Sequence, residues 1–206
     1  MSSNTQHETL RLSWEQGGEL VLSLDPLQGY WTETQYLLLT DQTQRLLEYT
    51  DGLLEVLPMP TEHHQAILEW LFLALRAFVE QIGGKVRFAP LRLQIRDGKY
   101  REPDILLVCD ANDPRRQNRY WLGADLVVEI VSADDPERDT QVKREDYAEA
   151  GIREYWIVNP IEQHICVLVL EDQHYHEYGV YQRGSAAHSL LLAGFSVNVD
   201  AVLDAQ

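Results

Sequence analysis

The amino-acid sequence predicts an α/β fold, with a mixed β-sheet core flanked by helices and additional β-hairpins at both ends of the chain. Strand-like segments fill both halves of the sequence, and two stretches with helical periodicity lie among them, at about residues 62–82 and 140–150. A length of 206 residues with 45% hydrophobic and 24% charged residues is typical of a soluble globular domain. We therefore expect a single domain, in which residues 1–45 form a hairpin and a short helix, 46–160 the core, and 161–206 the closing strands.

Two hairpins are predicted before residue 60. The first surrounds the residues EQGG, and the second surrounds Asp51-Gly52, a dipeptide that favours a tight hairpin turn. A short helix is expected between them, at residues 33–39. The four strands are the segments 10–14, 19–24, 45–49 and 53–57.

The clearest helix is expected from Glu62 to Ile82. Thr61 can cap its first turn, and Gly83-Gly84 should end it. Its predicted core stripe consists of Ile67, Leu71, Leu75, Phe78, Val79 and Ile82.

The second half of the chain is predicted to begin with a long hairpin. Its arms are residues 85–96 and 99–108, joined at Asp97-Gly98. A helix from about Thr140 to Ala150 should end at Gly151, which suits a left-handed position after the last turn. The remaining strands are 125–132, 154–158, 164–170 and 175–181, the last two as a hairpin.

The composition narrows the classes of function. A net charge of −16 would repel a polyanion, so a role with nucleic acid needs a local basic patch, a bound divalent cation, or both. Cys109 and Cys166 show neither metal-ligand spacing nor a disulfide framework, which favours a reducing cytoplasm. The first residues, MSSNTQHETLRLSW, lack the pattern of a secretion signal, and the longest apolar helical stretch contains Arg76 and is too short to span a bilayer. We expect a cytoplasmic protein with no membrane role.

Two strongly apolar segments each contain one carboxylate. Asp104 interrupts REPDILLV, and Glu129 interrupts DLVVEIVS, a run typical of a strand that is covered on both faces. An unpaired carboxylate in a core costs several kcal/mol, so each needs a partner. If the two strands are neighbours, both carboxylates can converge at one end of the sheet, where a divalent cation such as Mg²⁺, or Mn²⁺ in its place, would relieve their repulsion.

A lysine on the second helix is a candidate for the positive partner. Lys143, Tyr147 and Ala150 share one helix face, which should point inward. A fixed ammonium near Glu129 could orient a water molecule or stabilise charge that develops on a phosphate oxygen. Two carboxylates, one metal ion and one lysine suit the hydrolysis of a phosphodiester.

The segments EPD, VVEIVS and KREDYAEAGIREYWIVNP resemble the Uma-two family, whose members are described as bacterial endonucleases of the restriction-endonuclease-like superfamily with the PD-(D/E)XK motif. The resemblance runs from EYTDGLLEVLPMP to the closing LLLAGFSVNVDAVLDA, and its most specific part is Lys143 to Trp156. It implies a restriction-endonuclease-like fold and an endonuclease that uses Mg²⁺, with DNA as the expected substrate.

The resemblance also assigns roles to residues of this chain. Asp104 matches the aspartate of the PD element and Glu129 the acidic residue of the (D/E)XK element, and the main-chain carbonyl of Ile130 is expected to complete the protein's share of the metal shell. The motif's lysine position is occupied by Val131. Lys143 therefore resembles a migrated replacement.

Three further residues could join the site. Glu55 could add a carboxylate, and an exposed hairpin position fits it equally well. His64 and Gln65 open the long helix, where they could meet an anion, although such residues more often form a solvated first turn. Asp139 is interpreted as a helix cap.

The densest basic cluster is Arg115, Arg116 and Arg119. These side chains could contact a phosphate backbone, but a solvated loop is the favoured interpretation. The histidines show no zinc pattern, because His63 and His64 are adjacent.

Each site residue has an ordinary structural explanation as well. Asp104 could be a strand-end aspartate, Glu129 could form a buried salt bridge with Lys143 alone, and Lys143 could extend to solvent. Two alternatives to a nuclease therefore stay open. One is a catalytically degenerate nuclease fold that binds a partner, and the other is a structural protein in which the Glu129–Lys143 pair only specifies packing. A homodimer is compatible with cutting two strands, but no residue demands it.

Overall fold

The computed structural model describes residues 9–14, 18–43, 45–133 and 137–206. Two compact units are present, one formed by Met1–Met59 with Asp97–Arg101 and the other by Pro60–Arg96 with Glu102–Gln206. The expectation of a single domain stays a prediction, because one domain can contain two compact units. Among the described residues, no helix combines the length and the hydrophobicity that a bilayer crossing requires.

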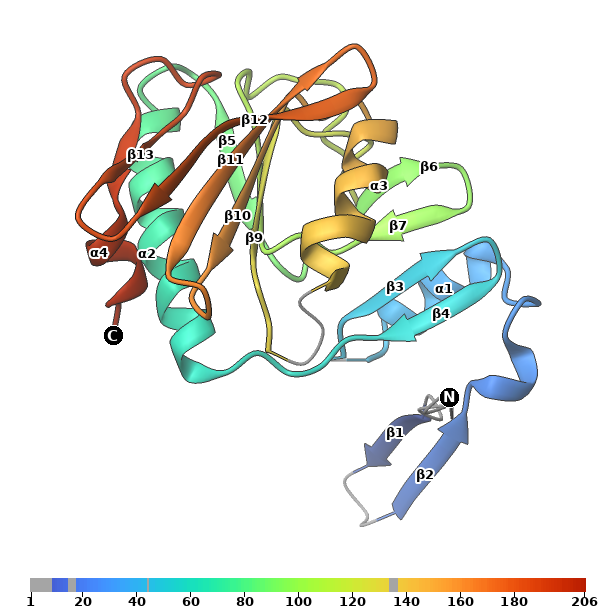
Figure 1. Ribbon diagram of the computed structural model, residues 1–206. Coiled ribbons are helices and arrows are strands. Elements are labelled where there is room, and N and C mark those ends of the chain that lie inside the picture. Colours follow the sequence, from blue (N-terminus) through green and yellow to red (C-terminus); the bar gives the residue numbers. More distant parts are fainter. Residues whose placement is uncertain (1–8, 15–17, 44, 134–136) are drawn as a thin grey trace. The chain divides into compact units, whose positions relative to one another are not determined.

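The smaller unit contains two antiparallel β-structures and one helix (Figure 1). As predicted, the first two strands form a hairpin, although its turn residues 15–17 lie outside the described residues. A second hairpin pairs β3 with β4, and β7 pairs with the other edge of β3. The elements are β1 (Thr9–Trp14), β2 (Gly18–Ser23), η1 (Asp25–Leu27), α1 (Glu33–Thr40), β3 (Leu47–Thr50), β4 (Leu53–Val56) and β7 (Lys99–Arg101).

A tight turn and a group of tyrosines stabilise this unit. Asp51 and Gly52 both have positive φ, at 47° and 91°, which is the twist that a two-residue hairpin turn requires. The rings of Tyr36 and Tyr49 stack with centroids 5.2 Å apart, and the Tyr100 ring lies 5.3 Å from that of Tyr36. The predicted hairpin is therefore confirmed, and aromatic side chains from a helix and two strands form its core.

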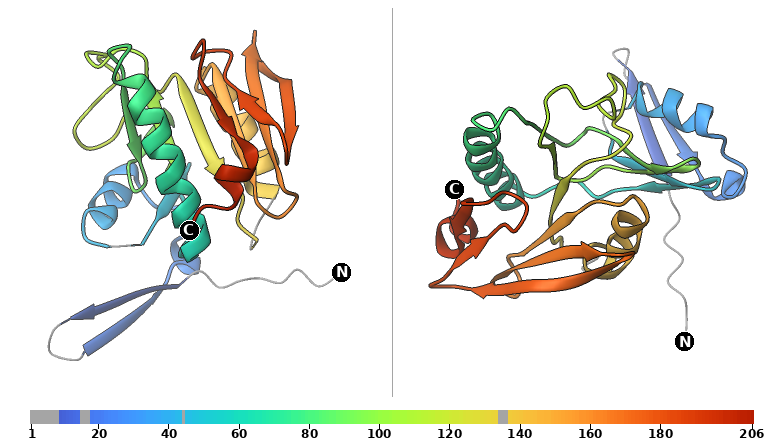
Figure 2. Two further views of the ribbon diagram at one scale, coloured as in Figure 1. Left: turned by 90° about the vertical axis from the view of Figure 1, so that its left-hand side faces the viewer. Right: turned by 90° about the horizontal axis from the view of Figure 1, so that it is seen from above.

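The larger unit is built on a six-stranded mixed sheet with the order β12-β11-β10-β9-β8-β5 (Figures 1 and 2). Only β9 and β10 run parallel, and their neighbours are antiparallel. Every residue of β9 is buried, as its continuous apolar sequence predicts. The strands are β5 (Lys85–Phe88), β8 (Ile105–Val108), β9 (Leu126–Ile130), β10 (Glu154–Asn159), β11 (His164–Glu171) and β12 (His174–Gln182).

Helices cover both faces of this sheet, which Figure 2 shows from two directions. The helix α2 (Glu62–Val79) packs on one face together with α4 (Val199–Leu203) and the small hairpin of β13 (Ala186–His188) and β14 (Ser196–Asn198). The helix α3 (Lys143–Glu149) packs on the other face, where β6 (Leu93–Arg96) also contributes to the core. Because side chains alternate along a strand, each strand of the sheet supplies both cores.

The structure corrects three details of the sequence prediction. The α2 helix begins after the cap at Thr61 as expected but ends at Val79, because the main-chain N–H groups of Gln81 and Gly83 donate to the third preceding residue, and Ile82 is exposed. The long hairpin of residues 85–108 is interrupted on both arms near Pro90 and Pro103, which cannot donate to a strand ladder. The predicted helix at residues 140–150 begins as a π-helical turn, η2 (Arg138–Val142), before it becomes α3.

The Asp51-Gly52 turn gives a test of the smaller unit. A Cβ at Gly52 would lie 2.7 Å from the main-chain oxygen of Gly29, whereas a Cβ at Gly29, which also has positive φ, would meet nothing within 4 Å. Gly29→Ala should therefore destabilise the fold by about 1 kcal/mol through φ strain alone, and Gly52→Ala by about 1–3 kcal/mol more. Denaturant unfolding of both variants measures the difference, and equal losses would contradict the close approach at Gly52.

Candidate active site

Asp104 and Glu129 lie at the same end of the sheet. The strands β8 and β9 pair with Ile105 opposite Val128, so Asp104, just before β8, and Glu129, near the end of β9, are neighbours across the ladder. By alternation along β9, Glu129 faces α3 together with Val127. The strand pairing that the sequence analysis assumed is therefore present.

The Asp104 carboxylate uses one of its two oxygens for contacts with the protein. Its Oδ2 accepts a hydrogen bond from the main-chain N–H of Ile130 at 2.7 Å and lies 3.2 Å from Nε2 of His64, in the first turn of α2. Within the described part of the chain, no residue donates a hydrogen bond to its Oδ1. One oxygen of this carboxylate is thus available to a ligand.

Glu129 shows the same asymmetry although only 2% of it is exposed. Its Oε1 lies 2.9 Å from Nζ of Lys143 and accepts a hydrogen bond from the Tyr147 hydroxyl. No described residue donates a hydrogen bond to its Oε2. Burial raises the pKa of Glu129 to about 8, against the opposing effect of Lys143, and the negative charge of Asp104 adds to the rise.

A third buried carboxylate in the same sheet accepts hydrogen bonds on both of its oxygens. Glu154, at the start of β10, accepts hydrogen bonds on Oε1 from the Trp156 indole and the Ser189 hydroxyl, and on Oε2 from the main-chain N–H groups of Leu190 and Leu191. Both of its oxygens are occupied, and it fastens the segment before β14 to the sheet. The free oxygens of Asp104 and Glu129 therefore do not follow from burial alone.

Lys143 is buried with its charge, so the interpretation that it extends to solvent is wrong. Only 3% of it is exposed, and its Nζ lies 3.1 Å from Oδ1 of Asp139 as well as beside Glu129. Asp139 makes no capping hydrogen bond with its side chain, so the cap prediction is also wrong. The sequence signal for this pair is the spacing of four residues between Asp139 and Lys143, at which helical side chains are neighbours.

The residues at this end of the sheet fit a hard divalent cation. The carboxylates of Asp104 and Glu129 are neighbours across the β8–β9 ladder, and Mg²⁺ binds oxygen ligands, often one or two carboxylates together with water. The described residues include no group of three or more His, Cys, Asp or Glu side chains that could hold a metal ion. A site here would thus rest on Asp104, Glu129 and a main-chain carbonyl, for which Ile130 is the expected donor.

His64 lies beside this carboxylate pair rather than in a solvated first turn. Burial lowers the pKa of its imidazole, but the hydrogen bond to Asp104, the charges of Asp104 and Asp139, and the Ile130 carbonyl together raise it above the ordinary value. A protonated His64 would add positive charge next to Asp104. The N-cap at Thr61, which accepts from the His64 N–H at 3.2 Å, helps to fix this turn.

Comparisons with known proteins place the chain in a family. The Uma2 family, described as "Putative restriction endonuclease", matches residues 33–200. The chain belongs to the Uma2 family. A crystal structure from Anabaena variabilis ATCC 29413, described as a "putative nuclease belonging to DUF820", is similar in fold with a TM-score of 0.64 and 20% sequence identity over 76% of this chain and 89% of that chain. No curated protein matches.

The family assignment and the α/β fold confirm the resemblance that the sequence suggested. In this Uma2 chain, Val131 stands where the wider motif has its lysine, and it is buried against the core on the α3 face. A lysine at that position would place a charge in an apolar core. Lys143 approaches Glu129 from α3 instead.

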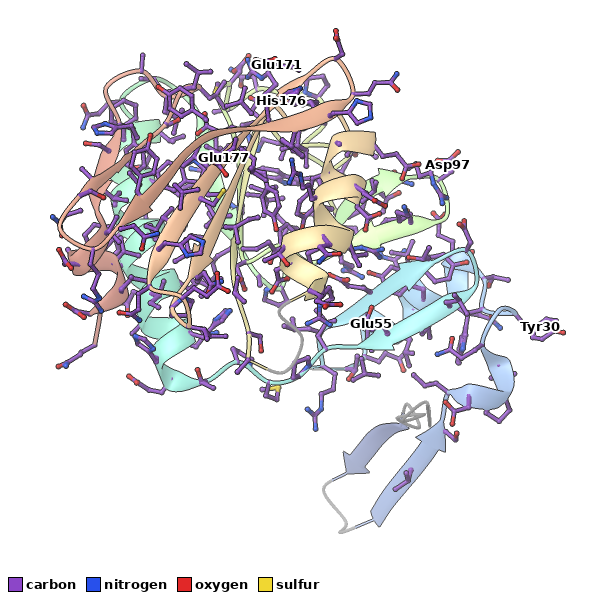
Figure 3. All side chains as sticks on the ribbon, in the orientation of Figure 1. Tyr30, Glu55, Asp97, Glu171, His176 and Glu177 are labelled. Atoms are coloured by element: carbon purple, nitrogen blue, oxygen red, sulfur yellow. The ribbon has the colours of Figure 1, made fainter. Side chains whose placement is uncertain are left out.

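One of the other candidates, Gln65, is not brought to the carboxylate pair. Gln65 is exposed on α2 and has no recorded contact with Asp104 or Glu129. Glu55 lies on β4 in the smaller unit, where Figure 3 labels it, and its role stays a prediction. Figure 3 also labels His176, whose Nε2 lies 3.9 Å from Glu171 in an exposed ion pair rather than in a metal cluster.

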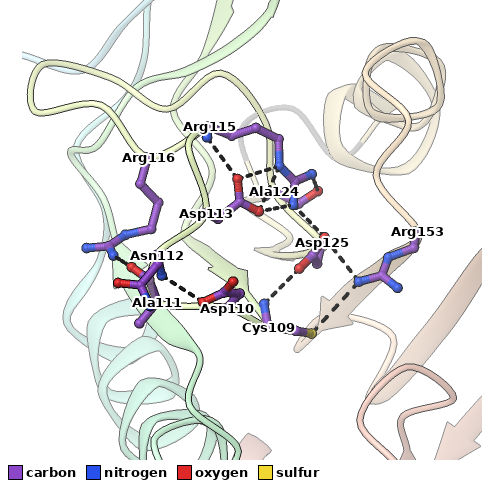
Figure 4. Close-up of polar contacts among 10 residues, drawn as sticks. All are labelled: Cys109, Asp110, Ala111, Asn112, Asp113, Arg115, Arg116, Ala124, Asp125 and Arg153. Atoms are coloured by element: carbon purple, nitrogen blue, oxygen red, sulfur yellow. Dashed lines mark hydrogen bonds and ion pairs between the residues drawn. The ribbon is translucent and has the colours of Figure 1, made fainter.

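The basic loop of this Uma2 chain is not simply solvated. Figure 4 shows Arg115 between two aspartates, with Nη2 2.5 Å from Asp113 and 2.7 Å from Asp125. Arg116 donates to the main-chain carbonyl of Ala111, and its guanidinium lies over the Trp121 ring, 5.6 Å from the centroid. Arg119 is exposed. The charges of Arg115 and Arg116 thus stabilise the loop, and a phosphate contact of these arginines stays a prediction.

The Arg115 cluster gives a test through pH. Burial raises the pKa of Asp125, but hydrogen bonds from Arg115 and the Cys109 N–H, with the charge of Arg153, lower it overall below 3.8. A lowered pKa contributes stability above pH 3.8 that is lost as the pH falls through the folded-state value. Asp125→Asn should therefore cost about 1–3 kcal/mol at neutral pH, and this difference should shrink below pH 3.8. Urea unfolding at several pH values measures it.

The matched control is Asp110→Asn in the same loop. Asp110 is exposed, and the one hydrogen bond that its carboxylate accepts from a described residue is local, from the Asn112 N–H. Its replacement should change the free energy of unfolding little at any pH. A loss for Asp125→Asn that does not depend on pH would contradict the ionic interpretation.

Proposed function

We propose that this Uma2 chain is a Mg²⁺-dependent endonuclease that hydrolyses phosphodiester bonds in DNA. One observation supports the proposal most directly. Asp104 and Glu129 each give one oxygen to the protein and keep the other without a partner among the described residues, whereas Glu154 in the same sheet has both oxygens occupied. Two such oxygens side by side suit a metal ion that also meets a phosphate.

Each residue has a role that follows from its contacts. Asp104, Glu129 and the Ile130 carbonyl would hold Mg²⁺, which when bound supplies positive charge and lowers the pKa of a bound water. Lys143 would orient the attacking water or stabilise the negative charge that develops on the phosphate oxygens. His64 contacts Oδ2 of Asp104 and the Tyr147 hydroxyl donates to Oε1 of Glu129, which holds the two carboxylates in place. Hydrolysis adds water across one P–O bond, and the strand ends as a phosphate and a hydroxyl.

Because the chain is acidic, it can bind DNA only where local positive charge offsets its net negative charge. A net charge of −16 opposes the approach of DNA, so the bound cation and exposed basic residues such as Arg119 would have to offset it. Binding should therefore be more sensitive to divalent ions than for a basic nuclease. A homodimer would place two such sites on the two strands of one duplex.

The competing proposal is a structural or binding role without catalysis. The burial of Lys143 favours this proposal, because Glu129, Asp139 and Lys143 form a charged group with almost no exposure to solvent. Val131 at the usual lysine position also fits a degenerate site. Metal binding separates these proposals from the nuclease, and cleavage decides between an active and a degenerate site.

The metal proposal is tested by Asp104→Asn and Glu129→Gln. Each replacement keeps an oxygen for the inner hydrogen bonds and removes the charge that a cation needs, so Mn²⁺ affinity should fall steeply while the fold is retained. Without metal, Asp104→Asn should keep or raise the free energy of unfolding, since the charge of Asp104 repels that of Glu129. Glu129→Gln also removes the buried ion pair with Lys143 and should lower it. Isothermal titration with Mn²⁺ measures the affinity.

Glu154→Gln is the matched control for this test. Its amide N–H₂ would face main-chain N–H donors, so the fold should lose about 1–3 kcal/mol while Mn²⁺ affinity is unchanged. Retained affinity in both site variants would rule the metal site out. Lost affinity in the control would show that any damage to the sheet has the same effect.

Cleavage is tested by Lys143→Ala in a supercoiled-plasmid nicking assay with Mn²⁺. If the ammonium acts on the reaction, nicking should fall on the order of 10²-fold while Mn²⁺ still binds. If Lys143 is only structural, its loss leaves a buried carboxylate unpaired and should destabilise the fold by ~3–5 kcal/mol. Lys85→Ala is the control, because Lys85 pairs with Val108 at the other end of β8. A parent protein that never nicks DNA would refute the nuclease proposal.

A further inference from the structure

Lys143 reaches Glu129 from an irregular part of the chain. The main-chain N–H of Lys143 donates to the carbonyl of Arg138, five residues earlier, so the turn Arg138–Val142 is π-helical where α3 begins. Such turns insert one extra residue into a helix and change which side chains align across it. The position of Lys143 therefore depends on the π-helical turn that precedes α3 as well as on α3 itself.

Asp139 is the residue of this turn that contacts the lysine. Its Oδ1 lies 3.1 Å from Nζ of Lys143, in an ion pair rather than a well-directed hydrogen bond, and only 3% of Asp139 is exposed. The same ammonium lies 2.9 Å from Oε1 of Glu129. These two carboxylates restrict the position of the ammonium, because all three charged groups are buried away from water.

The main chain of Asp139 is fixed by a second contact. The Tyr155 hydroxyl, from β10, donates to the Asp139 carbonyl at 2.6 Å, and Tyr155 is fully buried. The Tyr155 ring also packs edge-on against the Tyr147 ring, with centroids 5.1 Å apart. A rigid strand thus holds the π-helical turn, the turn holds Lys143, and Tyr147 holds Glu129.

We propose that Asp139, anchored through its carbonyl by Tyr155, is the positioning residue that holds the Lys143 ammonium against Glu129. Lys143 can then take the place of the motif lysine, whose position is Val131 in this chain. The proposal rests on the nuclease function proposed above. It assigns a role to two residues, Asp139 and Tyr155, that touch neither the expected metal shell nor the substrate. It also explains why a π-helical turn is present beside the carboxylate pair.

The position of Lys143 can be measured without any cleavage assay. The chain has three lysines, and Lys85 and Lys99, each partly exposed, serve as internal references in acetylation followed by mass spectrometry. In the parent, Lys143 should react far more slowly than both. In Asp139→Asn and in Tyr155→Phe, its rate should rise several-fold while the rates of Lys85 and Lys99 stay the same.

Tyr175→Phe is the matched control for Tyr155→Phe. Tyr175 is also buried, and its hydroxyl donates to a main-chain carbonyl, that of Ile152, at 2.7 Å. Its replacement removes the same kind of hydrogen bond from the same face of the sheet without touching the π-helical turn. The stability of this variant should fall about as much as that of Tyr155→Phe, but Lys143 should stay unreactive.

Nicking assays complete the test. Asp139→Asn and Tyr155→Phe should lower Mn²⁺-dependent nicking roughly 10- to 100-fold, as for a misplaced catalytic group, with Mn²⁺ affinity retained and Tyr175→Phe unaffected. Unchanged Lys143 labelling in both variants would overturn the proposal, and so would increased labelling with undiminished nicking. If the parent does not nick DNA, the nuclease function fails and the catalytic role of Asp139 fails with it. The labelling then reports separately whether Asp139 holds the lysine.

Discussion

The burial of Glu129 in the middle of β9 is the constraint on which the larger unit depends. This strand lies inside the sheet and is covered on both faces, so a carboxylate there can be reached only by side chains from the α3 face. Lys143 and Tyr147 meet it from that helix, and Asp139 stabilises the lysine from the preceding turn. A buried charged group of this kind is stable only when every member has its partner, which makes the placement of α3 inseparable from the site.

The sheet contains two solutions to the same physical problem. Glu154 is surrounded by four donors, two of them main-chain N–H groups, and it fastens the segment around Ser189 to β10. Glu129 and Asp104 are held by one oxygen each and keep the other oriented but without a protein partner. The first arrangement stabilises the fold, and the second leaves a concentrated negative charge that a cation would neutralise. A ligand site is expected where a buried carboxylate has an oxygen without a hydrogen bond, because a carboxylate whose oxygens are all hydrogen-bonded cannot readily bind a ligand.

The clustering of basic residues along the sequence does not predict where positive charge lies in the folded protein. Arg115 and Arg116 belong to the densest basic segment, yet one is enclosed by Asp113 and Asp125 and the other contacts Trp121 and a carbonyl. Lys143 is isolated in the sequence, yet it is the cation at the carboxylate pair. The local electrostatics of this chain are therefore decided by a few buried contacts rather than by the net charge of −16.

The sequence by itself determined the features that depend on short-range chemistry: the Asp51-Gly52 turn, the cap at Thr61 and the buried run of β9. It placed Asp104 beside Glu129 only on the condition that their strands pair, and the tertiary structure supplies that pairing. The sequence also indicated that Lys143 faces inward, because helical spacing places it with Tyr147. Only the tertiary structure decided that His64 meets Asp104, that Asp139 pairs with Lys143 through a π-helical turn, and that Arg115 is enclosed by aspartates. These contacts depend on how a helix is rotated against the sheet and on an extra residue in one turn. Neither leaves a periodic pattern in the sequence, because both are set by packing between segments that are distant along the chain.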